Sequence, residues 1–216
     1  MVEERLKAWE ILFQRALQLM DSASAAGARL NDWTFGGGTV LMRRHRHRLS
    51  KDIDIFVGDP QYLGFLSPRL SAAAESLTTH YIEQSGFVKL YFPEGEIDFV
   101  VSGPLTRKPA QSELLFGRTV AVETSTEIVG KKVWYRGAEF TARDIFDLAM
   151  VLEKEPQALT EIRPILRDRR NILLERIERL HERLREDFEA LEILEYRRSY
   201  DECVDRVRHV LEDAAN

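Results

Sequence analysis

Hydrophobic side chains recur every three or four residues near the start of the chain, as they do on the buried face of an amphipathic helix. Good helix formers fill the positions between them, and Gly27 follows as a terminator. The apolar positions are Leu6, Trp9, Ile11, Leu12, Phe13, Ala16, Leu17 and Met20. The pattern predicts a helix over residues 3–26.

The pattern changes between residues 32 and 60. A short aromatic run is followed by three glycines, a small apolar stretch, a basic stretch and the alternating residues DIDIFV. Alternation with a period of two is typical of a half-buried strand, and glycines allow a tight turn. We therefore expect a strand, a glycine turn, a helix, a loop and a second strand. This strand should end at Asp59-Pro60, because proline lacks the N–H that a sheet requires. Trp33 and Phe35 are expected in the core.

The middle of the chain predicts one more helix and then a run of strands. Ser67 and Pro68 are the residue types of a helix cap and a first helical position, so a helix is expected over residues 67–80. Three alternating stretches follow, YIEQ, FVKLYF and EIDFVVS, and predict an antiparallel meander. A further strand is expected at RTVAVE, followed by the helices TEIVGKKVWYR and TARDIFDLAMVLEK.

The composition shifts near the C-terminus. Charged side chains make up 27 of the 60 residues from 157 to 216, and apolar residues continue at three- and four-residue steps with one seven-residue gap. Such a stripe predicts helices that pack through one face. We therefore expect an α/β (α+β) core, residues 1–155, in which helices flank a mixed or antiparallel sheet. A C-terminal helical segment, residues 156–216, is expected to pack on this core. A dimerisation or partner-binding helix is the alternative.

Charge and cysteine content narrow the class of protein. The 216 residues carry 31 basic and 36 acidic side chains, a formal net charge of -5, which argues against a uniformly basic nucleic-acid binder. The single cysteine, Cys203, can form neither an intramolecular disulfide nor a cysteine-based zinc site. No apolar run reaches the ~18 to 20 residues of a membrane span. We expect a soluble cytoplasmic protein with no membrane partner.

Candidate chemistry is concentrated between Gly36 and Asp54. Asp52 and Asp54 are two residues apart on a predicted strand, so both point to the same face. Adjacent carboxylates repel each other unless a cation lies between them, and Mg²⁺ favours one or two carboxylates together with substrate phosphates. Glycines before a helix allow the backbone to approach a phosphate, and the helix N-terminus attracts anions. The pattern predicts a phosphate-bearing substrate.

This pattern differs from two common phosphate-binding motifs. No Gly-Lys-Ser/Thr follows the glycines, as it does in a Walker A loop, and the G-x-G-x-x-G spacing of a dinucleotide fold is absent. The combination of a glycine turn and D-x-D resembles the nucleotidyltransferases of the polymerase-β-like superfamily, and within it the AbiEii/AbiGii abortive-infection toxin group. The residues that carry the resemblance are GGT at 37–39, HRLS at 47–50 and DIDIF at 52–56.

The resemblance continues along the chain, over residues 33–152. In this superfamily a third carboxylate on a neighbouring strand completes a metal triad, and Asp98 in EIDFVV is the best match, with Glu96 as a substitute. The toxin group then has a lysine, an arginine and an R-D-hydrophobic-x-D-L helix. Here EIVGKKVWYRG precedes FTARDIFDLAMV. Lys132 is the preferred match to the lysine and Lys131 the second choice. One departure is Gly36, where relatives often have lysine.

The resemblance implies a polymerase-β-like core and roles for individual residues. The implied catalytic residues are Asp52, Asp54, Asp98 and Lys132, and the three aspartates would bind Mg²⁺ or Mn²⁺. The residues implied in nucleotide binding are Gly37, Gly38, Thr39, Arg48, Ser50, Lys132, Arg136, Asp144 and Asp147. Asp144 and Asp147 are three residues apart on one helix face. They could order Lys132, Arg136 or a substrate hydroxyl, or act only as capping and salt-bridge carboxylates.

The implied reaction transfers NMP from an NTP to an acceptor hydroxyl. The acceptor would be RNA, for example a tRNA end, or a protein, and an antitoxin protein is an expected partner. Two alternatives stay open. One is an inactive nucleotidyltransferase-like module that binds or interacts, and the other is a nucleotidyltransferase for a small molecule of the antibiotic type.

The stretch RRHRHR at 43–48 allows several interpretations, because five Arg and Lys residues lie between 43 and 51 with no acidic residue among them. It could receive the phosphate backbone of an RNA acceptor. Alternatively, His47 and Arg48 stabilise the active-site loop and the other residues are solvated. A zinc site at His45 and His47 lacks a cysteine or a nearby carboxylate to complete a tetrahedral set.

Overall fold

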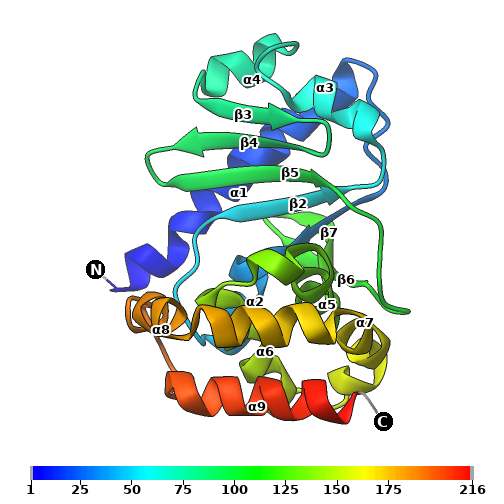
Figure 1. Ribbon diagram of the computed structural model, residues 1–216. Helices are drawn as coiled ribbons and strands as arrows, with labels where there is room; N and C mark the ends of the chain where they lie inside the picture. Colours follow the sequence, from blue (N-terminus) through cyan, green and yellow to red (C-terminus); the bar gives the residue numbers. More distant parts are fainter. Residues whose placement is uncertain (1, 215–216) are drawn as a thin grey trace. The chain divides into compact units, whose positions relative to one another are not determined.

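The computed structural model describes residues 2–214, which form two compact units (Figure 1). Unit 1 comprises residues 1–40, 50–103 and 110–123, and unit 2 comprises residues 41–49, 104–109 and 124–216. The boundary that we expected at residue 155 falls within unit 2, between two of its helices. Each unit is described by itself below.

Unit 1 contains a seven-stranded mixed sheet in the order β3-β4-β5-β2-β1-β7-β6. The strands are β1 (Trp33–Gly36), β2 (Ile53–Val57), β3 (Tyr81–Gln84), β4 (Phe87–Phe92), β5 (Gly95–Val101), β6 (Ala110–Leu115) and β7 (Arg118–Glu123). β2 pairs with β5 and β1 with β7 in parallel, and the other neighbours are antiparallel. The expected mixed α/β architecture with a helix-flanked sheet is confirmed.

The long helix α1 (Val2–Ala25) packs on the central strands β2 and β5 of this sheet (Figure 1). Its residues Trp9 and Phe13 stack with Phe35 of β1, and with Phe116 in the turn between β6 and β7. Phe116 and Gly117 both have positive φ, the conformation that a two-residue hairpin turn requires. The aromatic cluster therefore holds Phe116 in a conformation that non-glycine residues rarely adopt.

The helix expected over residues 67–80 is shorter than predicted and begins later. The short helix α3 (Leu63–Leu66) ends before Ser67, and α4 (Ala72–Leu77) begins later, after the N-cap Ser71. The hydroxyl of Ser67 is buried and donates to Glu83 instead of capping a helix. The 3-10 turn η1 (Pro60–Tyr62) precedes α3 and is capped by Asp59, where the preceding strand was expected to end.

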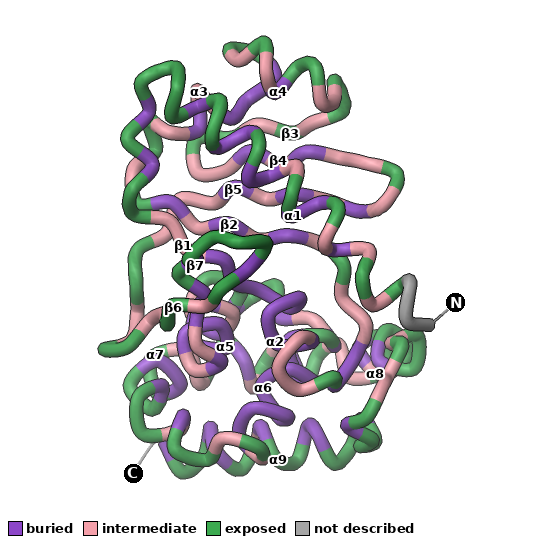
Figure 2. Tube along the Cα trace, turned by 180° about the vertical axis from the view of Figure 1, so that it is seen from behind, coloured by how far each residue is buried: buried purple, intermediate pink, exposed green. Residues whose placement is uncertain are grey.

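Unit 2 is helical. The helix α2 (Gly37–His45) contributes its residues from Leu41 onward to this unit and its first four residues to unit 1. The other helices are α5 (Ser125–Arg136), the 3-10 turn η2 (Gly137–Glu139), α6 (Ala142–Lys154), α7 (Ala158–Arg179), α8 (His181–Glu189) and α9 (Tyr200–Asp213). α7 packs on α5, and α9 packs on α6. Figure 2 shows α6 as a nearly continuous buried segment at the centre of these helices. Across residues 2–214, no helix is long and apolar enough to cross a membrane.

Candidate functional site

One face of the sheet in unit 1 carries a cross-strand row of polar residues. Asp54 of β2 is the register partner of Asp98 on β5, and Asp98 lies opposite Lys89 on β4. On the other side, Asp54 lies opposite Gly36 at the end of β1. Register partners on neighbouring strands point to the same face. Lys89, Asp98, Asp54 and Gly36 therefore lie side by side on one face and are called the carboxylate row from here on. Figure 2 shows the strands that carry them, β4, β5, β2 and β1, in that order.

Asp98 has the most unusual environment in the carboxylate row. Its Oδ2 atom accepts a hydrogen bond of 2.8 Å from Nζ of Lys89, which also binds Glu96. Its buried Oδ1 atom has no hydrogen-bond partner among residues 2–214. Burial and the charge of Asp54 raise the pKa of Asp98 to about 7, although Lys89 acts in the opposite direction. An oxygen in such a position suits a cation that takes carboxylate ligands.

Asp52 is positioned differently, just before β2. Its Oδ1 atom accepts a hydrogen bond of 3.1 Å from the backbone N–H of Glu96. Gly95, with a φ of +153°, allows this approach, because a Cβ atom there would lie 2.8 Å from Oδ1 of Asp52. Within residues 2–214, no three His, Cys, Asp or Glu side chains converge as a complete metal-ligand group. The acidic side chains fit a divalent cation by type, with Asp54 and Asp98 already adjacent.

The glycine turn approaches the carboxylate row closely. Gly37 has a φ of +74°, and a Cβ atom at this residue would lie 1.9 Å from Oδ2 of Asp54. A Cβ atom on Gly36 would lie 2.3 Å from Oε2 of Glu123, which is buried at the end of β7 and accepts a hydrogen bond from Thr34. A larger residue at position 36 would therefore require the side chains of Glu123 and Phe56 to move.

The N-terminus of α2 is fixed to the segment that precedes β2. The fully buried hydroxyl of Thr39 donates to the backbone carbonyl of Asp52 at 2.6 Å and lies 3.2 Å from the hydroxyl of Ser50. The first turn of α2 has no acidic side chain, so its N–H groups and helix dipole favour an anion. Thr39 and Ser50 thus connect the glycine turn to the D-x-D segment.

Unit 2 contains a second polar group, the buried ionic cluster of His47, Arg48, Lys132, Asp144 and Asp147. Arg48 donates to both oxygens of Asp147 at 2.7 Å, and Nε2 of His47 lies 2.8 Å from Oδ1 of Asp147. Nζ of Lys132 lies 2.6 Å from Asp144 and 3.1 Å from Asp147. The structure therefore brings four of the predicted nucleotide-binding residues, Arg48, Lys132, Asp144 and Asp147, into one cluster.

The sequence positions this cluster through a helix cap and an extended loop. Thr141 and Asp144 form a capping box at the start of α6, and Asp147 follows one turn later. Residues 46–49 run beside residues 192–195, with backbone hydrogen bonds from Leu49 to Glu192 and from Leu194 to His47. These contacts hold His47 and Arg48 over α6.

Charges within the cluster compensate for burial. Burial opposes ionisation of Asp144 and Asp147, but Lys132, Arg136 and Arg48 outweigh it and lower the pKa of both carboxyls. Burial also lowers the pKa of His47, whose Nδ1 atom has no hydrogen-bond partner among residues 2–214. A neutral ring that donates from Nε2 to Asp147 satisfies both observations, because protonated Nδ1 would bury a donor without an acceptor.

A family model described as "Nucleotidyl transferase AbiEii toxin, Type IV TA system" matches residues 18–215. The chain belongs to the AbiEii toxin family. It is therefore a nucleotidyltransferase, as the glycine turn and the D-x-D segment predicted. No curated protein matches the chain.

Solved structures with the same fold include the nucleotidyltransferase toxin MenT4 from Mycobacterium tuberculosis H37Rv. It is 17% identical, with a TM-score of 0.54, over 98% of this chain and 84% of its own length. JHP933 from Helicobacter pylori is 15% identical, with a TM-score of 0.49, over 92% of this chain and 89% of that one. At this identity, the likeness to MenT4 concerns the fold alone.

The remaining predicted residues of this AbiEii-family chain lie apart from the two polar groups or at their edge. Nζ of Lys131 lies 3.7 Å from Glu127, and Lys131 is not part of the ionic cluster. Arg136 is half-exposed, with its guanidinium 3.4 Å from Asp144. His45, the last residue of α2, lies 2.9 Å from Glu155, so the two histidines of the H-x-H pair have different carboxylate partners.

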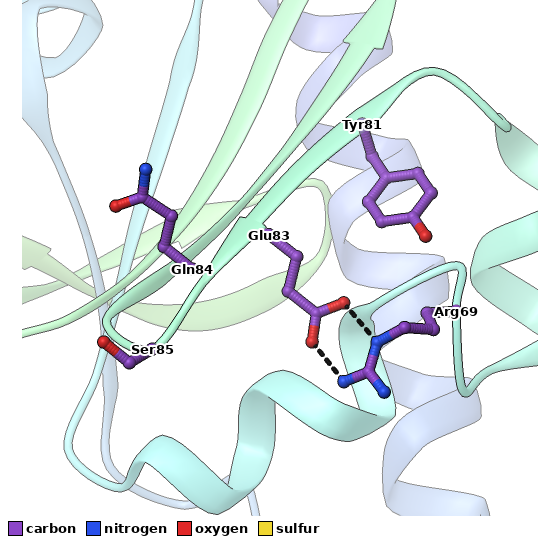
Figure 3. A pocket seen from close by; sticks show the side chains of 5 residues that line it. All are labelled: Arg69, Tyr81, Glu83, Gln84 and Ser85. Atoms are coloured by element: carbon purple, nitrogen blue, oxygen red, sulfur yellow. Dashed lines mark hydrogen bonds and ion pairs between the residues drawn. The ribbon is translucent and has the colours of Figure 1, made fainter.

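Two surface pockets lie away from the carboxylate row. One, of about 610 Å³, lies beside β3 and is lined by Arg69, Tyr81, Glu83, Gln84 and Ser85. Figure 3 shows Arg69 already paired with Glu83, at 2.6 and 3.0 Å. The other, of about 410 Å³, lies in unit 2 beside Arg48 and the start of α6. Asp52, Asp54 and Asp98 line neither pocket.

Sequence reasoning missed Lys89 and Glu123. Lys89 is the third residue of FVKLYF, and pairing this stretch with EIDFVV in a tight hairpin would have placed it opposite Asp98. Glu123 ends the predicted strand RTVAVE, where a charged last residue is usually solvated. Only the parallel pairing of β7 with β1 shows that it lies beside the glycine turn.

Proposed function

We propose that this chain transfers NMP from an NTP to an acceptor hydroxyl in a metal-dependent reaction at the carboxylate row. The observation that carries the proposal is the adjacency of Asp54 and Asp98 beside the Gly37 turn. The chemical need is specific, because a triphosphate requires both an anion-binding backbone and carboxylates for its accompanying cation. Both are present within unit 1.

In this proposal Asp54, Asp98 and Asp52 hold Mg²⁺ or Mn²⁺. The bound cation would supply charge compensation for the phosphates and lower the pKa of the attacking hydroxyl. The acceptor oxygen forms a bond to the α-phosphorus in line with the bond to the bridging oxygen, which breaks and releases pyrophosphate. The hydroxyl proton passes to a carboxylate of the row, so that atoms and charge balance.

Gly37, Gly38 and the N-terminus of α2 are the proposed triphosphate contacts, because their backbone can be approached closely. Thr39 and Ser50 support this turn through the hydrogen bonds described above. In unit 2, Lys132, Arg136, Arg48, Asp144 and Asp147 stay predicted nucleotide-binding residues. Arg136 is the most exposed side chain among these five, at 50%, which makes its guanidinium the most accessible to a phosphate.

We further propose that the acceptor is RNA, for example a tRNA end, or a protein, and that an antitoxin accompanies the toxin in the cytoplasm. The family description, a toxin of a type IV toxin–antitoxin system, supports the antitoxin. The basic stretch at 43–48 offers less support for an RNA acceptor than its sequence suggests, because His47 and Arg48 are buried against Asp147, and His45 and Arg46 pair with Glu155 and Glu195. A buried thiol at Cys203, with its pKa raised by burial to about 12, suits a reducing compartment in which no disulfide is needed.

The decisive experiment measures incorporation of label from each α-³²P NTP with Mg²⁺ or Mn²⁺. Parallel reactions contain total RNA, a protein lysate or an aminoglycoside, so that the labelled product identifies the acceptor class. We expect Asp54→Asn to lower incorporation more than about 100-fold. Loss of a residue that only hydrogen-bonds to a metal ligand lowers activity about 10- to 100-fold, and loss of the ligand itself should lower it further.

Asp21→Asn is the matched control, since Asp21 is half-exposed and pairs with Arg118 on the surface of the same unit. We expect it to keep incorporation within about twofold, as surface substitutions usually do. Equal incorporation by wild type and Asp54→Asn would refute the proposed function.

A further inference from the structure

Lys89 is the only positively charged residue of the four in the carboxylate row. Its Nζ atom lies 2.8 Å from Oδ2 of Asp98 and also contacts Glu96, two residues before Asp98 on β5. The Lys89 side chain is 24% exposed and that of Asp98 is 21% exposed, so solvent weakens this contact only in part. Lys89 lies on β4 directly opposite Asp98 on β5, and this cross-strand pairing fixes its position.

The two oxygens of Asp98 are therefore not equivalent. Oδ2 is bound by the ammonium group, whereas Oδ1 has no hydrogen-bond partner among residues 2–214. A divalent ion on the Lys89 side of Asp98 would meet a positive charge at close range. An ion on the other side would meet Oδ1 of Asp98 and the register partner Asp54. Coulomb repulsion over a few ångströms at a half-buried site is strong enough to decide between these positions.

We propose that Lys89 is a built-in counter-cation that restricts the carboxylate row to one divalent ion and weakens the binding of that ion. The ammonium group compensates for the negative charge of Asp98 and Glu96. In a site with two ions, the second metal would compensate for that charge instead. Lys89 thus acts as a positioning residue, because it holds Asp98 through Oδ2 and sets which oxygen is available. The inference rests on the proposed function, since it assigns the row to a divalent ion.

The test measures the affinity and stoichiometry of Mn²⁺ binding by electron paramagnetic resonance of the free ion, at pH 8 and low ionic strength, without nucleotide. We expect Lys89→Met to bind Mn²⁺ at least about tenfold more tightly than wild type, or to bind a second ion, because a nearby positive charge is removed. Lys89→Arg keeps this charge and should bind as wild type does. Arg118→Met removes one positive charge from a surface ion pair of the same unit and is the matched control.

Unchanged or weaker Mn²⁺ binding by Lys89→Met would overturn the inference, as would tighter binding by Arg118→Met to the same extent. Absence of Mn²⁺ binding in wild type and Lys89→Met alike would overturn it as well. Urea unfolding of each variant establishes that the measured chains are folded. Label incorporation by wild type judges the proposed function separately, so an active enzyme with unchanged Lys89→Met affinity would disprove only the role of Lys89.

Discussion

At the residue scale, the contact between Gly37 and Asp54 sets the strictest requirement on side-chain size. The backbone of Gly37 is in the left-handed region, and the position of its missing Cβ atom lies 1.9 Å from the Asp54 carboxylate. Gly37 directly follows β1, and Asp54 is the second residue of β2, which pairs with β1, so neither can shift without disturbing β1 or β2. The Asp54 side chain therefore requires a glycine at position 37, in addition to any role that the turn and the carboxylate share in binding.

We expect Gly37→Ala to destabilise the protein by about 1–3 kcal/mol from backbone strain alone, and to displace the Asp54 side chain. The midpoint of urea unfolding and the incorporation of labelled NTP measure the two effects. Gly86→Ala is the control, because a Cβ atom there meets nothing within 4 Å. A Gly37→Ala protein with wild-type stability and incorporation would contradict this account of the turn.

At the element scale, the buried ionic cluster connects the loop after α2 with α5 and α6 inside unit 2. Buried ion pairs contribute little net stability, but loss of one partner is costly because a buried charge is left uncompensated. His47 differs from its neighbours in this cluster, since its own burial favours the neutral ring. Its protonation should therefore oppose folding.

This predicts a pH dependence of stability that comes from His47. The pKa of His47 in the folded protein lies below 6.5, so below pH 6.5 the unfolded chain binds a proton that the folded chain does not. The contribution of His47 to the free energy of unfolding should fall as the pH drops from 7.5 to 5.5, by at most about 1.4 kcal/mol per pH unit. Asp98, whose pKa is raised to about 7, acts in the opposite direction over the same range in wild type and variant alike, so the contribution of His47 is the difference between wild type and His47→Gln. Urea unfolding at pH 7.5, 6.5 and 5.5 measures this fall.

His47→Gln keeps a donor toward Asp147 but does not titrate, so it should show a smaller fall over the same range. The lowered pKa values of Asp144 and Asp147 affect stability only below about pH 3.8, outside this window. Identical pH profiles for wild type and His47→Gln would show that the ring is not held neutral.

Elements with a strong local pattern were predictable from the sequence, and elements defined by distant partners were not. The alternation in DIDIFV and EIDFVV reveals β2 and β5, and the resemblance to the polymerase-β-like superfamily singled out Asp98. The pairing of β2 with β5 that makes Asp98 the neighbour of Asp54 joins residues 44 positions apart. β6 escaped prediction because AQSELL is mostly polar, as an exposed edge strand can be. The helix predicted over 67–80 is limited to Ala72–Leu77, because the Ser67 hydroxyl donates to Glu83 and Ser71 caps the helix instead.

At the scale of the whole molecule, the chain crosses between the two units several times. Residues 41–49 and 104–109 belong to unit 2, although their neighbours in sequence belong to unit 1. The helices α5 and α6, which we expected to complete the core, are packed by α7 and α9 within unit 2. The C-terminal helices are therefore part of the hydrophobic core that holds the ionic cluster.

We therefore expect a chain truncated after residue 155 to lose the fold of unit 2. The side chains that α7 and α9 bury in this unit include Ile162, Leu166, Leu173, Ile177, Val204, Val207 and Leu211. Each buried aliphatic side chain contributes about 1.5–3 kcal/mol, so their joint loss exceeds about 10 kcal/mol. A domain has about 5–15 kcal/mol of stability in total. Loss of cooperative unfolding by circular dichroism, with binding of a hydrophobic dye, is the expected result.

A chain that ends at residue 214 should unfold as the full chain does. If the truncated chain instead unfolds cooperatively at the same urea midpoint, the C-terminal helices are an appendage and not part of the core of unit 2.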